Sequence, residues 1–148
     1  MEIERKFLVS VLPEEYKNYP RHRIEQAYLC VLPVVRVRRS DDQYYLTYKG
    51  SGLLMREEAN LPLTEESYIH LLKKADGNVI AKDRYCIPYE GYTIELDVFD
   101  EPFAPLMVAE VEFSTEEEAL AFMPPDWFGE EVTYDPSYTN AALSRKQF

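Results

Sequence analysis

The sequence contains few of the residues that most often build metal and redox sites. It has two cysteines and two histidines among 148 residues. Cys30 and Cys86 lack the spacing of a thiolate metal site, so we expect two free thiols packed as small apolar residues. His22 falls in a predicted loop and His70 in a predicted helix, and we interpret both as structural. We therefore expect neither a zinc site nor a structural disulfide.

Long apolar runs and an excess of basic charge are also missing. No stretch approaches the roughly 20 apolar residues of a membrane span, and the start lacks a basic segment followed by an apolar one. Asp and Glu outnumber Lys and Arg by 27 to 16, which gives a net charge of -11. Nucleic acids and anionic membranes are bound largely by Lys and Arg, so we expect neither as a partner. A cytoplasmic location is predicted.

The remaining composition is that of an ordinary globular domain. Apolar residues make up 46% of the chain and charged residues 29%. A chain of this length forms one domain with a sizeable core, so residues 1–148 are predicted to be a single unit. The one tryptophan, Trp127, follows two prolines and is interpreted as a packing anchor.

Alternating apolar and polar residues dominate the pattern and predict a protein made mostly of strands. Turn residues, such as Ser40-Asp41-Asp42 and Gly50-Ser51-Gly52, separate the alternating segments. Eight strands are predicted, over residues 1–7, 23–31, 34–39, 43–49, 53–61, 79–89, 92–99 and 106–113. Helices are predicted over 13–19, 64–75, from a capping box at Ser114 to Pro124, and from Asp135 to the C-terminus.

The first strand carries charges on one face. Glu2, Glu4 and Lys6 share that face, and Arg5 lies on the other. Two carboxylates about 6.6 Å apart, followed by an ammonium, suit a divalent cation beside an anionic ligand. Later strands repeat this alternation. The resulting charged set has seven acids (Glu2, Glu4, Glu58, Glu95, Asp97, Glu110, Glu112) and seven bases (Lys6, Arg36, Arg38, Lys49, Arg56, Lys82, Arg84).

The charged set has two interpretations. For any one strand, the simpler is the solvated face of an open antiparallel sheet. Taken together, however, the charges separate by strand: acidic pairs lie on the first, seventh and eighth predicted strands, basic pairs on the third and sixth. We therefore predict an α+β fold in which eight antiparallel strands close into a barrel, or tunnel. Its lumen would be polar and charged, with helices packed on the outside.

A lumen of this composition favours a metal-assisted phosphate site. A guanidinium group binds phosphate through two parallel hydrogen bonds, and carboxylates bind hard cations such as Mg²⁺ or Mn²⁺. Such a metal would polarise a phosphoryl oxygen and activate a water molecule, while the bases neutralise charge in the transition state.

The run Glu2-Ile3-Glu4-Arg5-Lys6 matches the ExExK signature of the CYTH domain family, also called triphosphate tunnel metalloenzymes. The chain resembles this family along almost its whole length, and the resemblance implies an eight-stranded tunnel acting on triphosphates with a divalent metal. Asn60 departs from it, because the family often has an acid there. The other matching segments are Arg36-Val37-Arg38, Leu46-Thr47-Tyr48-Lys49, Arg56 with Glu58, Lys82-Asp83-Arg84-Tyr85, Glu95-Leu96-Asp97, Glu110-Val111-Glu112-Phe113, and Val132-Thr133-Tyr134-Asp135 followed by Tyr138 and Asn140.

The resemblance also implies roles for the charged set. The metal ligands would be Glu2, Glu4, Glu110 and Glu112, while Glu58, Glu95 and Asp97 support a second metal or orient the bases. The phosphate-binding residues would be Lys6, Arg36, Arg38, Lys49, Arg56, Lys82 and Arg84. Catalysis would depend on Glu2, Glu4, Lys6, Lys82 and Arg84.

The family resemblance covers inorganic triphosphatases, thiamine triphosphatases and class IV-type adenylate cyclases. Members that consist of the bare domain resemble inorganic triphosphatases, and no predicted strand here offers a tryptophan platform for an organic group. We therefore expect hydrolysis of inorganic tripolyphosphate to pyrophosphate and phosphate, with Mg²⁺ or Mn²⁺, by a monomer or homodimer. Thiamine triphosphatase, adenylate cyclase and a non-catalytic polyphosphate- or nucleotide-binding module stay open as alternatives.

Overall fold

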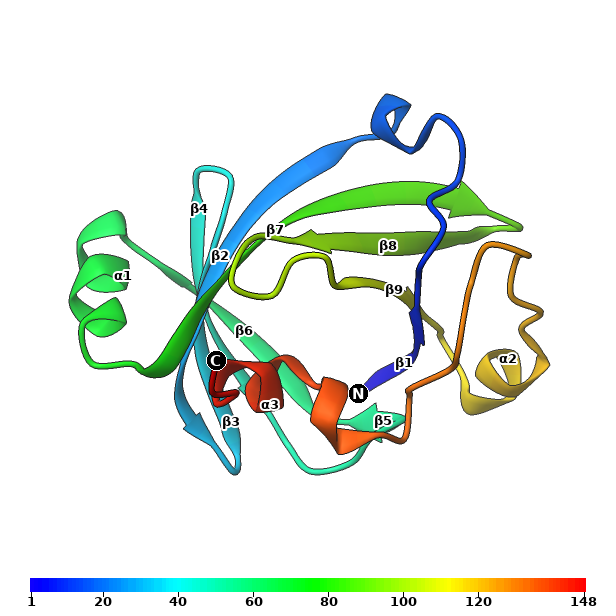
Figure 1. The fold of residues 1–148 in the computed structure, drawn as a ribbon. Coiled ribbons are helices and arrows are strands. Elements are labelled where there is room, and N and C mark those ends of the chain that lie inside the picture. The colour runs from blue at the N-terminus through cyan, green and yellow to red at the C-terminus, as the bar shows by residue number, and fades with distance from the viewer.

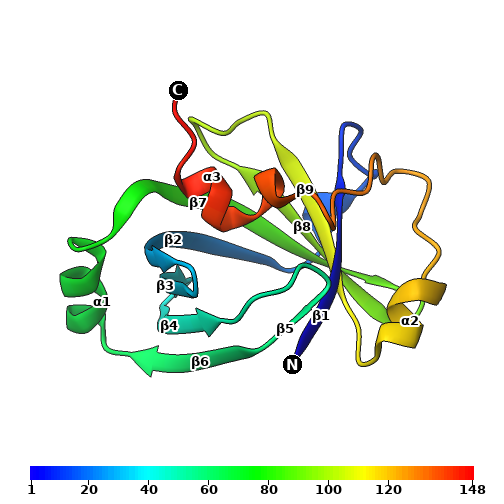
Figure 2. The same ribbon diagram turned by 90° about the horizontal axis from the view of Figure 1, so that it is seen from below.

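Nine strands of the chain form one antiparallel sheet that curls into a nearly closed barrel (Figures 1 and 2). The structure is a computed structural model that describes residues 1–148. The strands are β1 (Glu2–Leu8), β2 (Arg21–Val31), β3 (Val34–Ser40), β4 (Gln43–Lys49), β5 (Met55–Arg56), β6 (Glu58–Leu63), β7 (Asp76–Tyr89), β8 (Tyr92–Phe99) and β9 (Met107–Glu112).

The two edge strands of the sheet meet at Glu57, where the barrel nearly closes. The strand order is β5-β1-β9-β8-β7-β2-β3-β4-β6, so the two end strands are neighbours in sequence, separated by this one residue. The strand predicted over 53–61 is therefore two strands, and the predicted count of eight becomes nine. The reason is that β5 pairs with β1 whereas β6 pairs with β4, so the chain changes partners where the sheet meets itself.

The helices are short and are fewer than the sequence pattern predicted. They are α1 (Glu65–Leu72), α2 (Glu116–Ala121) and α3 (Asn140–Ser144), with 3₁₀ turns η1 (Tyr16–Asn18) and η2 (Pro136–Tyr138). The helix predicted over 13–19 is only η1. The predicted cap at Ser114 is wrong by one residue, since the Thr115 hydroxyl accepts from Glu118 N. The predicted C-terminal helix is broken at Thr139, whose backbone is extended.

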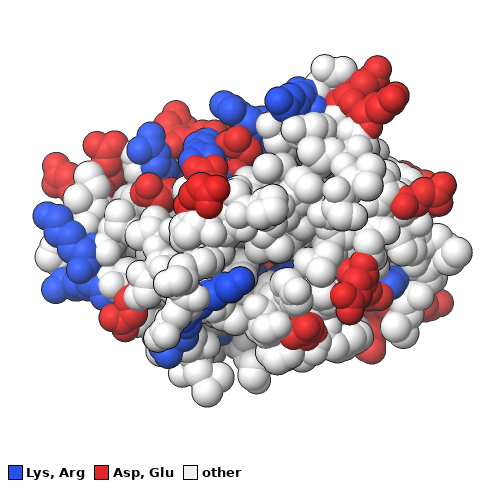
Figure 3. All heavy atoms as spheres, in the orientation of Figure 1, with Lys and Arg blue, Asp and Glu red and all other residues white.

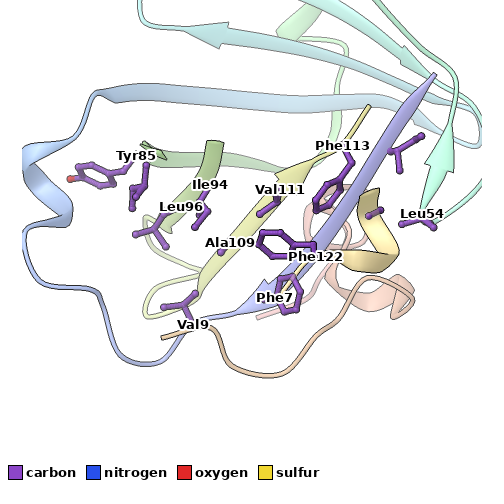
Figure 4. Close-up of a cluster of buried hydrophobic side chains, with 13 residues drawn as sticks. Phe7, Val9, Leu54, Tyr85, Ile94, Leu96, Ala109, Val111, Phe113 and Phe122 are labelled. Carbon is purple, nitrogen blue, oxygen red and sulfur yellow. The ribbon is translucent and has the colours of Figure 1, made fainter. Parts of the chain in front are cut away.

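The larger apolar core lies on the outer face of the barrel, as the alternation predicted. It includes Phe7 of β1, Leu96 of β8 and Val111 of β9, and Phe122 after α2 covers them (Figure 4). Trp127 packs against this core, which confirms its interpretation as a packing anchor. Helices cover only part of the outside: α2 packs against β1, and α1 packs against β3 and β4 at the opposite end of the molecule (Figure 2).

The inner face is not polar throughout, which corrects one part of the prediction. A second apolar cluster uses side chains with the same parity as the charged set, among them Tyr28, Val34 and Ile80. Leu143 of α3 packs into this cluster, and α3 lies against β2 and β7. The barrel therefore has a charged interior that ends in an apolar region beside α3.

Both thiols are free, as predicted. Cys30 is exposed, however, so only Cys86 is partly packed as expected. His22 lies in β2 and not in the loop predicted for it, and it contacts Asp41 at 2.7 Å. His70 is exposed on α1, and neither histidine lines the barrel interior. No helix has the length and apolar character to cross a membrane. On the face in Figure 3, acidic and basic side chains are interspersed, so this surface is not uniformly acidic.

The outer core gives a direct stability test. Leu96 is fully buried, so Leu96→Ala should lower the free energy of unfolding by about 2–5 kcal/mol through lost burial and a residual cavity. Leu120→Ala, at a side chain that is 68% exposed on α2, should stay within about 0.5 kcal/mol of the parent. Urea unfolding followed by circular dichroism measures both. Equal effects would mean that the core is assigned to the wrong face.

Candidate active site

A cavity of about 720 Å³ occupies the barrel interior. Twelve of the fourteen residues of the charged set line it, which agrees with the prediction that the alternation brings them together. These twelve are Glu2, Glu4, Lys6, Arg36, Arg38, Lys49, Arg56, Glu58, Arg84, Glu95, Glu110 and Glu112. Lys82 and Asp97 do not line it.

Most of the bases face an acid directly across the sheet. Four cross-strand pairs join a base to an acid: Lys6 with Glu110, Arg56 with Glu2, Lys49 with Glu58, and Arg84 with Asp97. Their shortest nitrogen–oxygen distances are 3.5, 3.4, 3.4 and 2.8 Å respectively. A buried charge is costly unless it is paired. These bases are therefore neutralised within the protein itself.

Arg36 and Arg38 on β3, which we call the arginine pair, are different. Arg36 is 4% exposed, donates to the Thr47 hydroxyl at 3.2 Å, and makes no ion pair; its Nε has no partner. Arg38 donates to the Gln26 carbonyl oxygen at 2.7 Å and also lacks an acid. Burial, together with Arg36 and Arg84, lowers the pKa of Arg38 to about 9. This uncompensated positive charge favours an anion.

Uncompensated negative charge lies on β1 and β9. Glu4 faces Glu112 directly across the two strands, and neither carboxylate makes a hydrogen bond or an ion pair. Like charges in this position repel. Burial and then Glu110 raise the pKa of Glu4 to about 8, and burial and then Glu95 raise the pKa of Glu112. A cation placed here would relieve both effects.

The donor set beside these two acids fits a hard divalent ion, because it consists of carboxylate oxygens only. Glu110 lies two residues before Glu112 on the same face of β9, opposite Lys6. Burial alone would raise the pKa of Glu110, but Lys6 and Arg84 outweigh burial and hold this pKa low. No three acidic or histidine side chains converge closely enough to hold a metal as the side chains stand. The fit therefore rests on the chemistry of the acids and their unbalanced charge.

Glu2 has a different environment from Glu4. Lys49 donates to both of its carboxylate oxygens at 3.0 Å, and Arg56 Nε is 3.4 Å from one of them. Burial and then the nearby Glu58 raise the pKa of Glu2 to about 7. In this arrangement Glu2 orients two bases of the cavity wall, and a metal would have to compete with them for its oxygens.

Lys82 and Asp97 form a buried pair behind the cavity wall. Their exposed fractions are 0% and 1%, and Lys82 Nζ lies 2.6 Å from Asp97 Oδ2. Burial lowers the pKa of Lys82 to about 7, although Asp97 opposes the shift. Arg84 joins this pair to the cavity by donating twice to Asp97, at 2.8 and 2.9 Å. The alternation gave the correct face for both residues, but both are buried. Lys82 Nζ lies 5.2 Å from the ring centroid of Phe99, a member of the second apolar cluster, and 3.5 Å from Asn140 Oδ1 at the start of α3.

Several residues of the cavity lining are polar but uncharged. Tyr28, Tyr45, Thr47, Thr139 and Asn140 line the interior. The three strand residues lie on the same face as the charged set, so the alternation could have identified them. Thr139 and Asn140 come from the C-terminal segment, whose path no pattern predicted. Asn60 also lines the cavity. Its amide donates to Glu58 at 2.7 Å, and its carbonyl oxygen accepts from the Thr47 hydroxyl at 2.6 Å.

Arg5 lies on the outer face of β1, as expected. It donates to both oxygens of Glu131 and to the Ala119 carbonyl oxygen at the end of α2. The Lys6 ammonium, on the opposite face, donates to the Tyr138 carbonyl oxygen at 3.1 Å. Adjacent residues of β1 thus attach the C-terminal segment to both faces of this strand.

The buried network beneath the cavity predicts a large loss of stability. Asp97→Asn leaves Lys82 and Arg84 without their buried counter-charge, so the free energy of unfolding should fall by about 3–5 kcal/mol. Asp100→Asn provides the matched control, because Asp100 pairs with Arg23 on the exposed surface and should change stability by less than about 1 kcal/mol. A small effect of Asp97→Asn in urea unfolding would show that the network is not a folding requirement.

The chain is similar to known proteins over nearly its whole length. The model of the CYTH domain matches residues 1–132. An inorganic triphosphatase of Nitrosomonas europaea is 41% identical over 150 residues, covering 97% of this chain and 96% of that protein. An inorganic triphosphatase of Acetivibrio thermocellus is 37% identical over 155 residues, covering 99% and 95%. A crystal structure of an inorganic triphosphatase has a TM-score of 0.74 at 36% identity, over 99% of this chain and 96% of that one.

Proposed function

The chain belongs to the CYTH domain family, and from this premise we propose that it hydrolyses inorganic tripolyphosphate to pyrophosphate and phosphate. Membership of this family implies a divalent metal cofactor and a small-molecule triphosphate substrate. We propose Mg²⁺ or Mn²⁺ as the ion, because both favour carboxylate oxygens.

One observation carries the proposal: a single cavity contains both an arginine pair without acids and two opposed acids without bases. An isolated anion-binding site would need the arginines but would gain nothing from Glu4 and Glu112. A phosphate chain carrying a metal ion satisfies both groups at once. The two relatives named inorganic triphosphatases support the choice of substrate.

The charged set then divides into roles. Arg36 and Arg38 hold phosphates that do not react, as charge-assisted clamps. Lys6, Lys49, Arg56 and Arg84 line the same cavity, but each is paired with an acid. They would therefore neutralise charge that develops on the transferred phosphoryl group only as they exchange these acids for phosphate oxygens. Lys82 acts through Asp97 and Arg84, because it does not reach the cavity.

Glu4 and Glu112 would hold the metal ion, with Glu110 beside them and Glu2 if Lys49 releases it. When bound, such an ion polarises a phosphoryl oxygen and lowers the pKa of a water molecule. Glu58, Glu95 and Asp97 are each bound to a base, which supports the role of orienting these bases over that of holding a second metal.

Three alternatives stay open: a thiamine triphosphatase, an adenylate cyclase and a binding module. Tyr28 and Tyr45 line the cavity and could contact an organic group, as a thiamine triphosphatase or an adenylate cyclase requires. A binding module without turnover would need only the bases.

Four further expectations from the sequence stay predictions. They are a monomeric or homodimeric state, the absence of a nucleic-acid partner, the absence of a membrane partner, and a cytoplasmic location.

A substrate panel tests the proposed reaction. With Mg²⁺ or Mn²⁺, we expect phosphate release from tripolyphosphate to exceed release from ATP and thiamine triphosphate, without cyclic nucleotide. Excess EDTA should abolish it. Faster turnover of an organic triphosphate would replace the inorganic substrate, and binding of tripolyphosphate without hydrolysis would favour the binding module.

Arg36→Ala tests the phosphate clamp. It should raise KM for tripolyphosphate about 10- to 100-fold, since a hydrogen bond to a charged group contributes about 1.5–3 kcal/mol. Arg23→Ala is the control, because Arg23 lies on the outer surface, paired with Asp100 and Asp83. Any residual activity toward a small monophosphate ester should change less, because such an ester cannot span the clamps. Equal losses on both substrates would contradict a site for a phosphate chain.

A further inference from the structure

We propose that Gln26 is a positioning residue for phosphate binding: its buried amide orients the Arg38 guanidinium without neutralising it. Thr47, backed by Asn60, does the same for Arg36. This inference rests on the proposed function, in which the arginine pair binds the phosphate chain.

Gln26 lies next to Arg38 in the sheet. The two residues are directly opposed on β2 and β3, and Gln26 is fully buried, with Ile80 of β7 on its other side. Its carbonyl oxygen accepts from Arg38 Nε at 2.7 Å, a short and therefore strong contact. This bond fixes the plane of the guanidinium and leaves the two terminal nitrogens for other acceptors.

Arg36 is held in an equivalent way two residues earlier on β3. It is opposed to Thr47 of β4, which is opposed in turn to Asn60 of β6. The Thr47 hydroxyl accepts from Arg36 Nη2 at 3.2 Å and donates to the Asn60 carbonyl oxygen at 2.6 Å. Because the Thr47 hydroxyl donates its hydrogen bond to Asn60, the Thr47 oxygen is oriented to accept from the arginine.

Both supports are neutral, in contrast to the rest of the cavity. Lys6, Lys49, Arg56 and Arg84 each face a carboxylate, whereas the residues opposed to the arginine pair are Tyr28, Thr47, Gln26 and Tyr45. An acid at position 26 would form an equally good hydrogen bond but would offset one positive charge in a desolvated site. An amide supplies direction and leaves the charge available.

The unsatisfied donors of the chain lie at the same place. The only two buried side-chain nitrogens or oxygens without a hydrogen-bond partner are Gln26 Nε2 and Arg36 Nε. Buried orphan donors are rare and unfavourable, and they call for a specific acceptor. Both sit on the two strands that carry the arginine pair and its support, so this region is short of acceptors as well as of negative charge. Phosphate oxygens in the cavity would supply negative charge and acceptors to Arg36, which lines it, whereas Gln26 lies behind the cavity wall.

The test compares Gln26→Glu with Gln26→Met. Gln26→Glu keeps the shape and adds a charge that pairs with Arg38, so it should raise KM for tripolyphosphate at least about tenfold with little change in kcat. Gln26→Met removes the hydrogen bond but leaves Arg38 charged, so the increase should be smaller, about two- to fivefold. Gln147→Glu, at an exposed residue near the C-terminus, controls for the added charge.

Calorimetric titration with tripolyphosphate in EDTA measures affinity separately from turnover, and thermal unfolding measures stability. If Gln26 only fills the interior, losses of affinity will follow losses of stability. Our proposal predicts the opposite order, with Gln26→Glu the weaker binder even where it is the more stable variant. Unchanged affinity in Gln26→Glu, or equal losses in both variants, would overturn it.

A second pair of variants covers the case in which Gln26→Glu fails to fold. Thr47→Val removes the hydroxyl at nearly constant volume and should weaken tripolyphosphate binding, and Thr47→Ser should restore most of the affinity. If Val and Ser bind equally, the positioning role is wrong. A parent protein that binds tripolyphosphate without hydrolysing it would refute the proposed function alone, because the affinity comparison would still stand. One that does not bind it would refute both.

Discussion

The structure depends on one physical constraint: a charge that leaves water must be compensated close by. Barrel closure wholly or partly buries thirteen of the fourteen charged residues, all except Glu112, and the sheet register meets the constraint by opposing most bases to acids. Lys6 with Glu110, and Arg84 with Asp97, are examples from different strands. The fold can therefore hold a charged interior because the register that forms the barrel also forms the ion pairs.

Charges lack a nearby partner of opposite sign at two places, and these two places define the site. Arg36 and Arg38 have positive charge without acids, and Glu4 and Glu112 have negative charge without bases. Replacing these residues by paired or apolar ones would be expected to increase stability, since functional sites commonly trade stability for activity. A ligand that carries both signs, such as a phosphate chain with a divalent ion, compensates both places together.

Period-two alternation predicted much of this arrangement because it is a local property that survives folding. It assigned the face of each strand correctly, and twelve of the fourteen charged residues line the cavity. It could not assign depth, so Lys82 and Asp97 were expected to line the lumen although both are buried behind the cavity wall. It also missed the break at Glu57, because closure depends on which strands pair and not on which side a residue points.

A list of the charged residues leaves out the neutral residues beside them, and these neighbours affect whether a charge is available to a ligand. The sequence pattern places seven bases on one face but does not show which of them an acid neutralises; in the folded protein they differ by their neighbours. Lys49 next to Glu58 is an internal counter-ion, whereas Arg38 next to Gln26 remains a cation of the cavity. The difference lies in one amide that alternation places correctly but that carries no charge to attract notice. In this barrel, our proposal therefore gives the neutral polar residues opposite the arginine pair the role of leaving its charge available to a ligand.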